Sequence, residues 1–150
     1  MCIYIVNLIG KEASILGKWA VIDLETTGLS PVNDEIIDVG YLLFDGLKLV
    51  NKYSSLVRPV EVMPSKFMQK LTGISVKQLK HAPTWDEVVY QLDELEGAQL
   101  LAHNADFEKS FLDQHLADQD NAFWDSIPLL GILNIKQSRL GLEKFIVHYK

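Results

Sequence analysis

The stretch Lys18–Ser30 (KWAVIDLETTGLS) decides the fold of this chain. Its first part, Lys18–Leu24, is rich in branched and aromatic side chains, as is typical of a buried strand. The run TTGLSP that follows consists of turn-forming residues. Asp23 and Glu25 stand two positions apart at the end of this strand, so both side chains leave the same face of the sheet. The sequence therefore predicts a buried strand that carries two neighbouring carboxylates at its carboxyl end.

These two carboxylates need a partner if they are buried. Asp23 and Glu25 repel each other when both are charged, and burying them unpaired is costly. A bound Mg²⁺ or Mn²⁺ relieves that cost, because hard cations take oxygen ligands. The alternative is a solvated strand end with two ordinary acids, and the Asp-x-Glu pattern alone does not decide between the two. The flanking Thr26, Thr27 and Gly28 predict a tight turn whose exposed backbone N–H groups can approach a nucleotide.

A second polar cluster, His103–Glu108 (HNADFE), directly follows a short apolar segment and opens a predicted helix. Asn104 is a suitable cap for that helix, and Glu108 falls near its positive dipole end. Asp106 and Glu108 stand two apart on the helix and face roughly opposite ways, so only one can reach a site shared with the first strand. The alternative is a helix start whose acids are placed only for the dipole.

The order of predicted elements is typical of a mixed α/β sheet with helices packed on it. Three strands come first, joined in part by an Asp-Gly hairpin turn, then two helices, a fourth strand and further helices. The expected strands cover 18–24, 35–44, 48–57 and 98–102, and the expected helices cover 64–71, 84–95 and 104–116, with a further start marked by Asp125 and Pro128 and a last helix bearing Leu142, Phe145, Ile146 and Tyr149. The first three strands should be antiparallel, while the fourth is reached through helices.

The composition is that of an ordinary globular domain of 150 residues with a formal net charge of −6. An acidic chain does not bind nucleic acid by general attraction to phosphate, so any such role must rest on a local site. A single cysteine, Cys2, excludes an intrachain disulfide and favours a reducing, cytoplasmic location. Residues 1–17 begin with an apolar stretch too short to span a bilayer, so we expect a leader or an extra strand and no membrane contact.

Together, the motifs resemble the DEDD superfamily of 3′-5′ exonucleases, in its DEDDh (DnaQ-like) branch. Asp23 and Glu25 match the first motif within VIDLETTG, and His103-Asn-Ala-x-Phe107 matches the second. The segment 33–40 (NDEIIDVG) resembles the strand after the first motif, and LTGI from Leu71 resembles a segment that packs near the terminal nucleotide. The resemblance covers the chain from about residue 18 to the end.

The resemblance implies a ribonuclease H-like mixed sheet and hydrolysis of phosphodiester bonds at nucleic-acid 3′ ends, DNA in preference to RNA, with two Mg²⁺ or Mn²⁺ ions. It assigns catalysis and metal binding to Asp23, Glu25 and Glu108. The positions that match substrate contacts are Thr26, Thr27, Leu71, Thr72, His103, Asn104 and Phe107. Members include the polymerase III epsilon subunit and exonuclease domains of polymerases and DinG-type helicases, so a polymerase or helicase, in cis or in trans, is the expected partner.

Two departures from the family pattern matter. Glu108 stands where the second motif usually has an aspartate, which keeps the charge but adds a methylene. Asp106, at a variable position of the motif, is the other candidate. The third motif, a histidine followed five residues later by an aspartate, has no match, because His148 is followed by only two residues. We therefore expect residues 18–150 to be an exonuclease domain that is C-terminally truncated, part of a larger protein, and weak or inactive by itself.

Three other interpretations stay open at this stage. A catalytically impaired exonuclease-like module could bind nucleic acid or a partner protein, as the glutamate and the unmatched third motif suggest. A nuclease of the same superfamily could act on RNA, because the motifs do not settle sugar preference. A plain interaction domain would require the acids to be placed by chance, and the order of the motifs argues against it.

Overall fold

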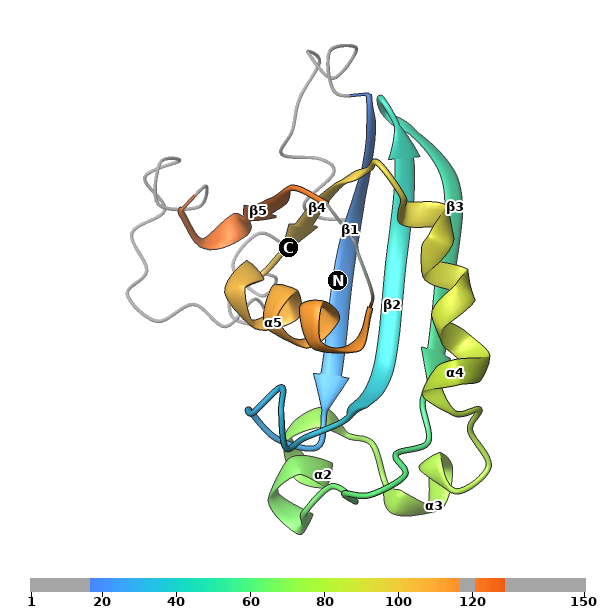
Figure 1. Cartoon of the computed structure of the whole chain (residues 1–150), viewed down its shortest axis with the longest axis vertical. Helices are drawn as coiled ribbons and strands as arrows, with labels where there is room; N and C mark the ends of the chain where they lie inside the picture. Colours follow the sequence, from blue (N-terminus) through green and yellow to red (C-terminus); the bar gives the residue numbers. More distant parts are fainter. Residues whose placement is uncertain (1–16, 117–120, 129–150) are drawn as a thin grey trace, which may run out of the picture.

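A five-stranded mixed sheet forms the centre of the structure, a computed structural model that describes residues 17–116 and 121–128. The strand order is β3-β2-β1-β4-β5 (Figure 1). The strands are β1 (Lys18–Thr26), β2 (Ile36–Asp45), β3 (Lys48–Leu56), β4 (Gln99–Ala102) and β5 (Phe123–Asp125). β1, β2 and β3 pair antiparallel, whereas β4 runs parallel to β1 and β5 parallel to β4. The predicted mixed sheet, with its antiparallel first three strands, is confirmed.

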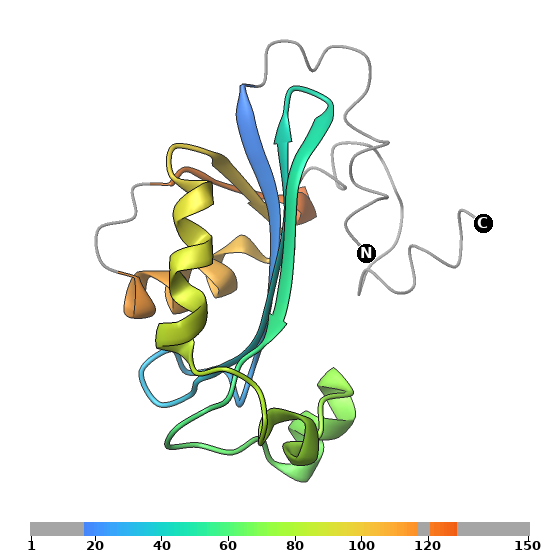
Figure 2. The same ribbon diagram turned by 90° about the vertical axis from the view of Figure 1, so that its right-hand side faces the viewer.

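The helices divide between one face of the sheet and one end of it (Figure 2). They are α2 (Lys66–Thr72), α3 (Val76–Leu79), α4 (Trp85–Val88), the 3₁₀ helix η2 (Val89–Leu95) and α5 (Ala105–His115). α4, η2 and α5 cover one face, and α2 and α3 lie beyond the end of the sheet. Within the described ranges, no helix is long and apolar enough to cross a membrane.

The two faces of β1 have different surroundings, as the period of two in a strand requires. Ala20, Ile22 and Leu24 point into the main core, where they join side chains of η2 and α5. Trp19 and Val21 point the other way and form a smaller buried cluster in which Trp19 stacks on Phe44, with ring centroids 4.5 Å apart. Asp23 and Glu25 continue this second face toward the carboxyl end of the strand.

The helix predicted over 84–95 is present in extent but not in uniform geometry. Glu87 accepts a hydrogen bond from the backbone N–H of Thr84 at 2.8 Å, as the predicted capping box requires. The α-helical turn then changes to a 3₁₀ helix at Val89. Consecutive β-branched and aromatic residues, Val88, Val89 and Tyr90, lower the α-helical preference there.

Two further expectations concern the end of the chain. The helical turn marked by Asp125 and Pro128 begins at residue 126, but the three-residue strand β5 directly before it was not predicted. Its pairing with β4 decides its conformation, and so short a run has no periodicity of its own. The amphipathic segment 142–149, His148 and the apolar stretch at the start of the chain lie outside the described residues.

Candidate active site

The carboxyl end of β1 delivers Asp23 and Glu25 to the face opposite the main core. In the register between β1 and β2, Asp23 lies opposite Gly40 and Glu25 lies opposite Asp38. The register shifts between Glu25 and Thr26, which ends the regular ladder at this point. Both carboxylates therefore stand on the regular part of the strand, directly before the place where the chain turns away.

Glu108 comes to these acids from the first turns of α5. Its side chain is buried, with only 4% exposed, whereas Asp106 is exposed. Burial raises the pKa of Glu108 to about 8, and the charges of Asp23, Asp125 and Glu25 act in the same direction against its own backbone N–H. One carboxylate oxygen, Oε2, is buried and has no hydrogen-bond partner in the described part of the chain. Of the two acids near the start of the helix, Glu108 thus faces the site.

The strand acids are also held in an environment that disfavours their charge. Burial raises the pKa of Glu25 to about 7, with further contributions from the charges of Asp23 and Asp38. Burial likewise raises the pKa of Asp23 above its usual range, and His103 opposes this. Asp38, for which the sequence suggested no site role, has a raised pKa through burial and the neighbouring Asp23. These carboxylates disfavour one another's charge, and a nearby cation would stabilise their charged forms.

The donor set suits a divalent cation in kind but does not by itself enclose one. All donors are carboxylate oxygens, which Mg²⁺ and Mn²⁺ prefer, and Glu108 Oε2 has no hydrogen-bond partner within residues 17–116 and 121–128. Among the described residues, however, no group of three or more His, Cys, Asp or Glu side chains is close enough to hold a metal ion together. Mg²⁺ commonly binds through one or two carboxylates, with water and substrate phosphate completing its shell. The arrangement fits such partial sites.

The turn after β1 is closed by its own side chains. The Thr27 hydroxyl donates to Asp34 Oδ1 and accepts from the Glu35 N–H, both at 3.0 Å. The Thr27 N–H donates to the Glu35 carbonyl oxygen at 2.9 Å, so this predicted exposed N–H is in fact occupied. The Thr26 hydroxyl donates to the Gly28 carbonyl. A side chain at Gly28 would overlap the Asp34 carboxylate, which explains the glycine. Both threonine hydroxyls serve the turn.

Glu35 ties a distant loop to this turn. Its carboxylate accepts hydrogen bonds from the backbone N–H groups of Val60, Glu61 and Val62 at 2.6–2.7 Å. That loop leads into α2, whose Leu71 side chain is 66% exposed. The Thr72 hydroxyl donates to the Met68 carbonyl at 2.9 Å and accepts from the Ile74 N–H at 3.1 Å. Of the two predicted contact residues on α2, Leu71 is open to a ligand and Thr72 closes the helix.

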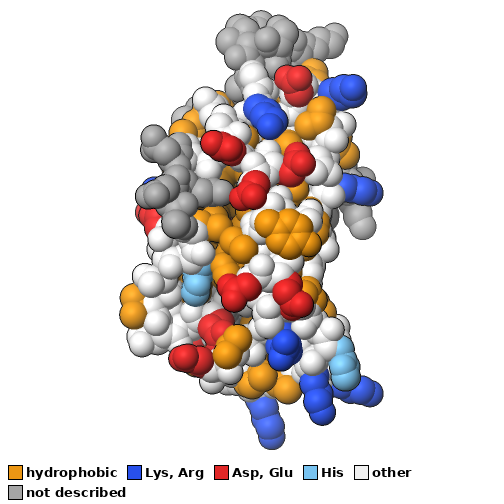
Figure 3. Space-filling view, turned by 45° about the vertical axis from the view of Figure 1, so that its right-hand side comes forward, with side chains coloured by type: hydrophobic (Ala, Val, Ile, Leu, Met, Phe, Trp, Pro, Cys, Tyr) orange, Lys and Arg blue, Asp and Glu red, His pale blue; other side chains and the backbone are white. Residues whose placement is uncertain are grey.

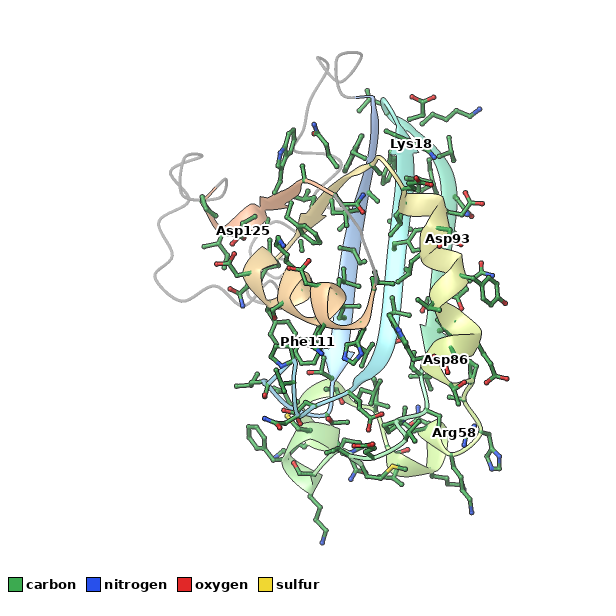
Figure 4. All side chains as sticks on the ribbon, in the orientation of Figure 1. Lys18, Arg58, Asp86, Asp93, Phe111 and Asp125 are labelled. Carbon is green, nitrogen blue, oxygen red and sulfur yellow. The ribbon has the colours of Figure 1, made fainter. Side chains whose placement is uncertain are left out.

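The start of α5 is organised from β5, which the sequence did not reveal. Asn104 is the N-cap residue in a left-handed conformation (φ 68°), but its side chain makes no capping hydrogen bond, so the predicted cap is wrong in this detail. Its N–H instead donates to Asp125 Oδ1 at 3.2 Å, which also accepts from the Ile127 N–H at 2.8 Å. His103 Nδ1 lies 2.9 Å from the Ser126 hydroxyl. Figure 4 shows Asp125 beside the first turn of α5.

Phe107 has a packing contact as well as its predicted place at the site. Its ring centroid lies 5.0 Å from that of Phe111, which is fully buried in the main core. Phe107 is itself only partly buried and packs against the main core. The Phe107 ring therefore contributes to the packing of the fold.

Fold and site together define a class: a mixed α/β domain that gathers acids from the end of its central strand and from a neighbouring helix. The family model RNase_T, described as Exonuclease, matches residues 20–144. The chain belongs to this exonuclease family, as its resemblance to the DEDDh branch predicted.

Relatives among well-described proteins agree. The chain is 44% identical over 103 residues to the DNA polymerase III PolC-type of Caldanaerobacter subterraneus subsp. tengcongensis, covering 68% of this chain and 7% of the relative. It is 32% identical over 105 residues to the 3′-5′ exonuclease DinG of Staphylococcus aureus, covering 69% of this chain and 12% of the relative. The chain thus spans only about a tenth of the length of these relatives.

Solved structures confirm the fold. A product-bound exonuclease I superimposes with a TM-score of 0.65 at 15% identity, over 76% of this chain and 31% of that one. The E. coli exonuclease I in complex with a dT13 oligonucleotide gives a TM-score of 0.67 at 14% identity, over 79% of this chain and 30% of that one. The ribonuclease H-like sheet with flanking helices is therefore confirmed.

Proposed function

We propose that this exonuclease domain removes nucleotides from the 3′ ends of DNA by metal-assisted hydrolysis. The observation that carries the proposal is Glu108, a buried acid with an unpartnered oxygen whose pKa responds to Asp23 and Glu25. A buried carboxylate oxygen without a donor is unfavourable in a structural role, and the charged neighbours here are also acids. A cation resolves both problems, and 3′-5′ exonucleases such as DinG are among the relatives.

The residues have separate tasks in this proposal. Asp23, Glu25 and Glu108 would together hold two Mg²⁺ or Mn²⁺ ions, directly or through water. When bound, such ions help to ionise the attacking water and stabilise charge at the scissile phosphate. Leu71 and Phe107 would contact the terminal nucleotide. The protein backbone around that nucleotide would be held by Thr26, Thr27, Thr72, His103 and Asn104. As in the larger relatives, we propose that the domain works within or beside a polymerase or helicase.

Metal binding gives the first test, because it is independent of turnover. We expect calorimetric titration with Mn²⁺ to show binding to the unmodified chain and to Asp106→Asn, and to show little binding to Glu25→Gln or Glu108→Gln. Trimming of 3′-labelled DNA and RNA oligomers, measured on the larger protein in which we propose that the domain works, should then show a preference for DNA. On the order of a thousandfold loss of trimming is expected for Glu25→Gln, since metal stabilisation of charge contributes several kcal/mol. Robust trimming by Glu108→Gln would overturn the ligand assignment.

A second candidate is a catalytically impaired module that binds nucleic-acid ends or a partner without cleaving. It is favoured by the longer side chain of Glu108 and by the finding that the described residues do not enclose a cation in a group of three. The same titration separates the two functions, because an impaired site would show no Mn²⁺ binding that depends on Glu25.

A further inference from the structure

Positive charge is concentrated at one end of this acidic chain. The formal net charge is −6, yet residues 62–85 contain four lysines and neither aspartate nor glutamate. The lysines are Lys66 and Lys70 on α2, Lys77 on α3 and Lys80 directly after it, and all four are exposed. In Figure 3, blue side chains gather at the lower end of the molecule, where Figure 1 places α2 and α3. We call residues 66–80 the basic end.

Apolar side chains alternate with the lysines on α2. Phe67 and Leu71 are 71% and 66% exposed, and they stand one helical turn apart, as Lys66 and Lys70 do. Residues four apart share a helix face, so α2 presents a basic stripe beside an apolar one. Met68 points inward and is buried. An exposed aromatic ring next to ammonium groups suits a ligand that offers both flat bases and phosphates.

The basic end lies next to the acidic site. Figures 1 and 2 both place α2 beside the end of β1, just after Asp23 and Glu25. The three hydrogen bonds of Glu35 to the loop at 60–62 fix the approach to α2. The Gln69 side chain accepts from the Val76 N–H at 3.3 Å, which joins α2 to α3. The basic end is therefore held in position relative to the acids.

We infer that the basic end binds single-stranded nucleic acid and leads the strand to the acidic site. This inference rests on the proposed function for the kind of ligand, since it takes the ligand to be a nucleic acid. Lysines neutralise backbone phosphates, and an exposed Phe67 offers a stacking surface that only unpaired bases can use. A single strand matches both stripes of α2, whereas an acidic peptide would match the lysines alone.

Binding measured without hydrolysis tests this surface. Fluorescence anisotropy of a labelled oligothymidylate, in EDTA and at several NaCl concentrations, would compare two variants with equal charge change. Lys66→Gln/Lys70→Gln alters the basic end, and Lys48→Gln/Lys52→Gln alters exposed lysines of β3 as a matched control. We expect the first variant alone to lose affinity, with the slope of log K against log salt reduced by about 1.4, because each phosphate contact on a single strand contributes about 0.7.

The aromatic stripe has its own control. Phe67→Ala should weaken binding about tenfold, as loss of one stacking contact does, while Tyr90→Ala, at an exposed ring of η2, should not. Circular dichroism would confirm that each variant is folded.

The outcomes separate this inference from the proposed function. Equal losses for both lysine pairs, no loss for either, or no binding by the unmodified chain would overturn the inference. Displacement of a polyglutamate peptide bound at these lysines, with no affinity for the oligomer, would assign the surface to an acidic protein partner instead. Lysine-dependent binding without Mn²⁺ binding at Glu25 would leave the inference standing and refute only the nuclease proposal.

Discussion

Two groups of carboxylates in this molecule have different surroundings in the fold. Asp34 accepts hydrogen bonds at 3.0 Å from the Thr27 hydroxyl and the Ser30 N–H, and Glu35 accepts three from the loop at 60–62. Glu108, in contrast, keeps one buried oxygen that has no hydrogen-bond partner among the described residues, and burial raises its pKa to about 8.

The difference indicates which acids stabilise the fold and which are reserved for a ligand. A carboxylate that accepts several N–H groups is stable in its charged form and holds segments together. A buried carboxylate beside other acids destabilises the folded state at neutral pH unless a cation is present. Removing one member of each group should therefore change stability in opposite directions.

The largest effect is expected for Glu35→Ala. Three backbone N–H groups would lose a charged acceptor, so we expect the free energy of unfolding to fall by about 2–3 kcal/mol, measured by urea denaturation. Glu61→Ala is the matched control, because that exposed side chain is adjacent to the same loop, and it should change stability little. If the two variants were equally stable, the loop would not depend on Glu35 and the comparison would fail.

A smaller effect of opposite sign is expected for Glu108→Gln. Because the folded-state pKa values of Glu25 and Glu108 are raised, to about 7 and about 8, the folded chain binds protons more tightly than the unfolded chain. Stability should therefore fall as pH rises from about 4.5 to about 8. Glu108→Gln removes one of these titrations and should stabilise the chain by on the order of 2 kcal/mol at pH 8, measured by thermal unfolding in EDTA.

Adding Mn²⁺ to the same stability measurement tests whether a cation offsets the unfavourable charges. Mn²⁺ should restore the stability of the unmodified chain at pH 8 and should have less effect on Glu108→Gln, because binding to the folded state alone stabilises it. Stability that rises steadily between pH 5 and pH 8 in EDTA would contradict the assignment of Glu25 and Glu108 as disfavoured charges.

The smallest effect concerns His115, which tests whether an unpartnered atom by itself marks a ligand site. Among the described residues His115 Nε2 is buried without a hydrogen-bond partner, and the ring lies between Trp85 and Phe111, where the charge of Glu35 acts on it. Burial lowers the pKa of this imidazole, so the neutral form is favoured on folding. Stability should fall as pH drops below about 6.5, by less than about 1 kcal/mol, and His115→Phe should remove this dependence.

The matched control is His81→Phe, at an exposed position, which should leave the acid limb of the profile unchanged. Mn²⁺ should have no influence on this limb. If Mn²⁺ changed the fall in stability at acid pH, His115 would belong to a ligand site, and the division between structural groups and site groups would be wrong.

The sequence predicted those parts of the site that depend on local periodicity. The shared face of Asp23 and Glu25 follows from the period of a strand, and the period of a helix shows that only one of Asp106 and Glu108 can face the site. The choice of Glu108 came from the resemblance to the family motif. Asp38 and Asp125 were not recognised as neighbours of the site, because only pairing with other strands places them there. The three N–H partners of Glu35 lie about 25 positions away, and no local pattern reveals them.

The parallel pairing of β4 with β1 has a consequence for how the chain folds during its synthesis. Trp19 lies beside Gln99, so the central ladder closes a long stretch of chain, and such distant contacts form slowly. During synthesis, Asp23 and Glu25 leave the ribosome long before Glu108 does. The acids of β1 therefore cannot be joined by Glu108 until α5 has emerged.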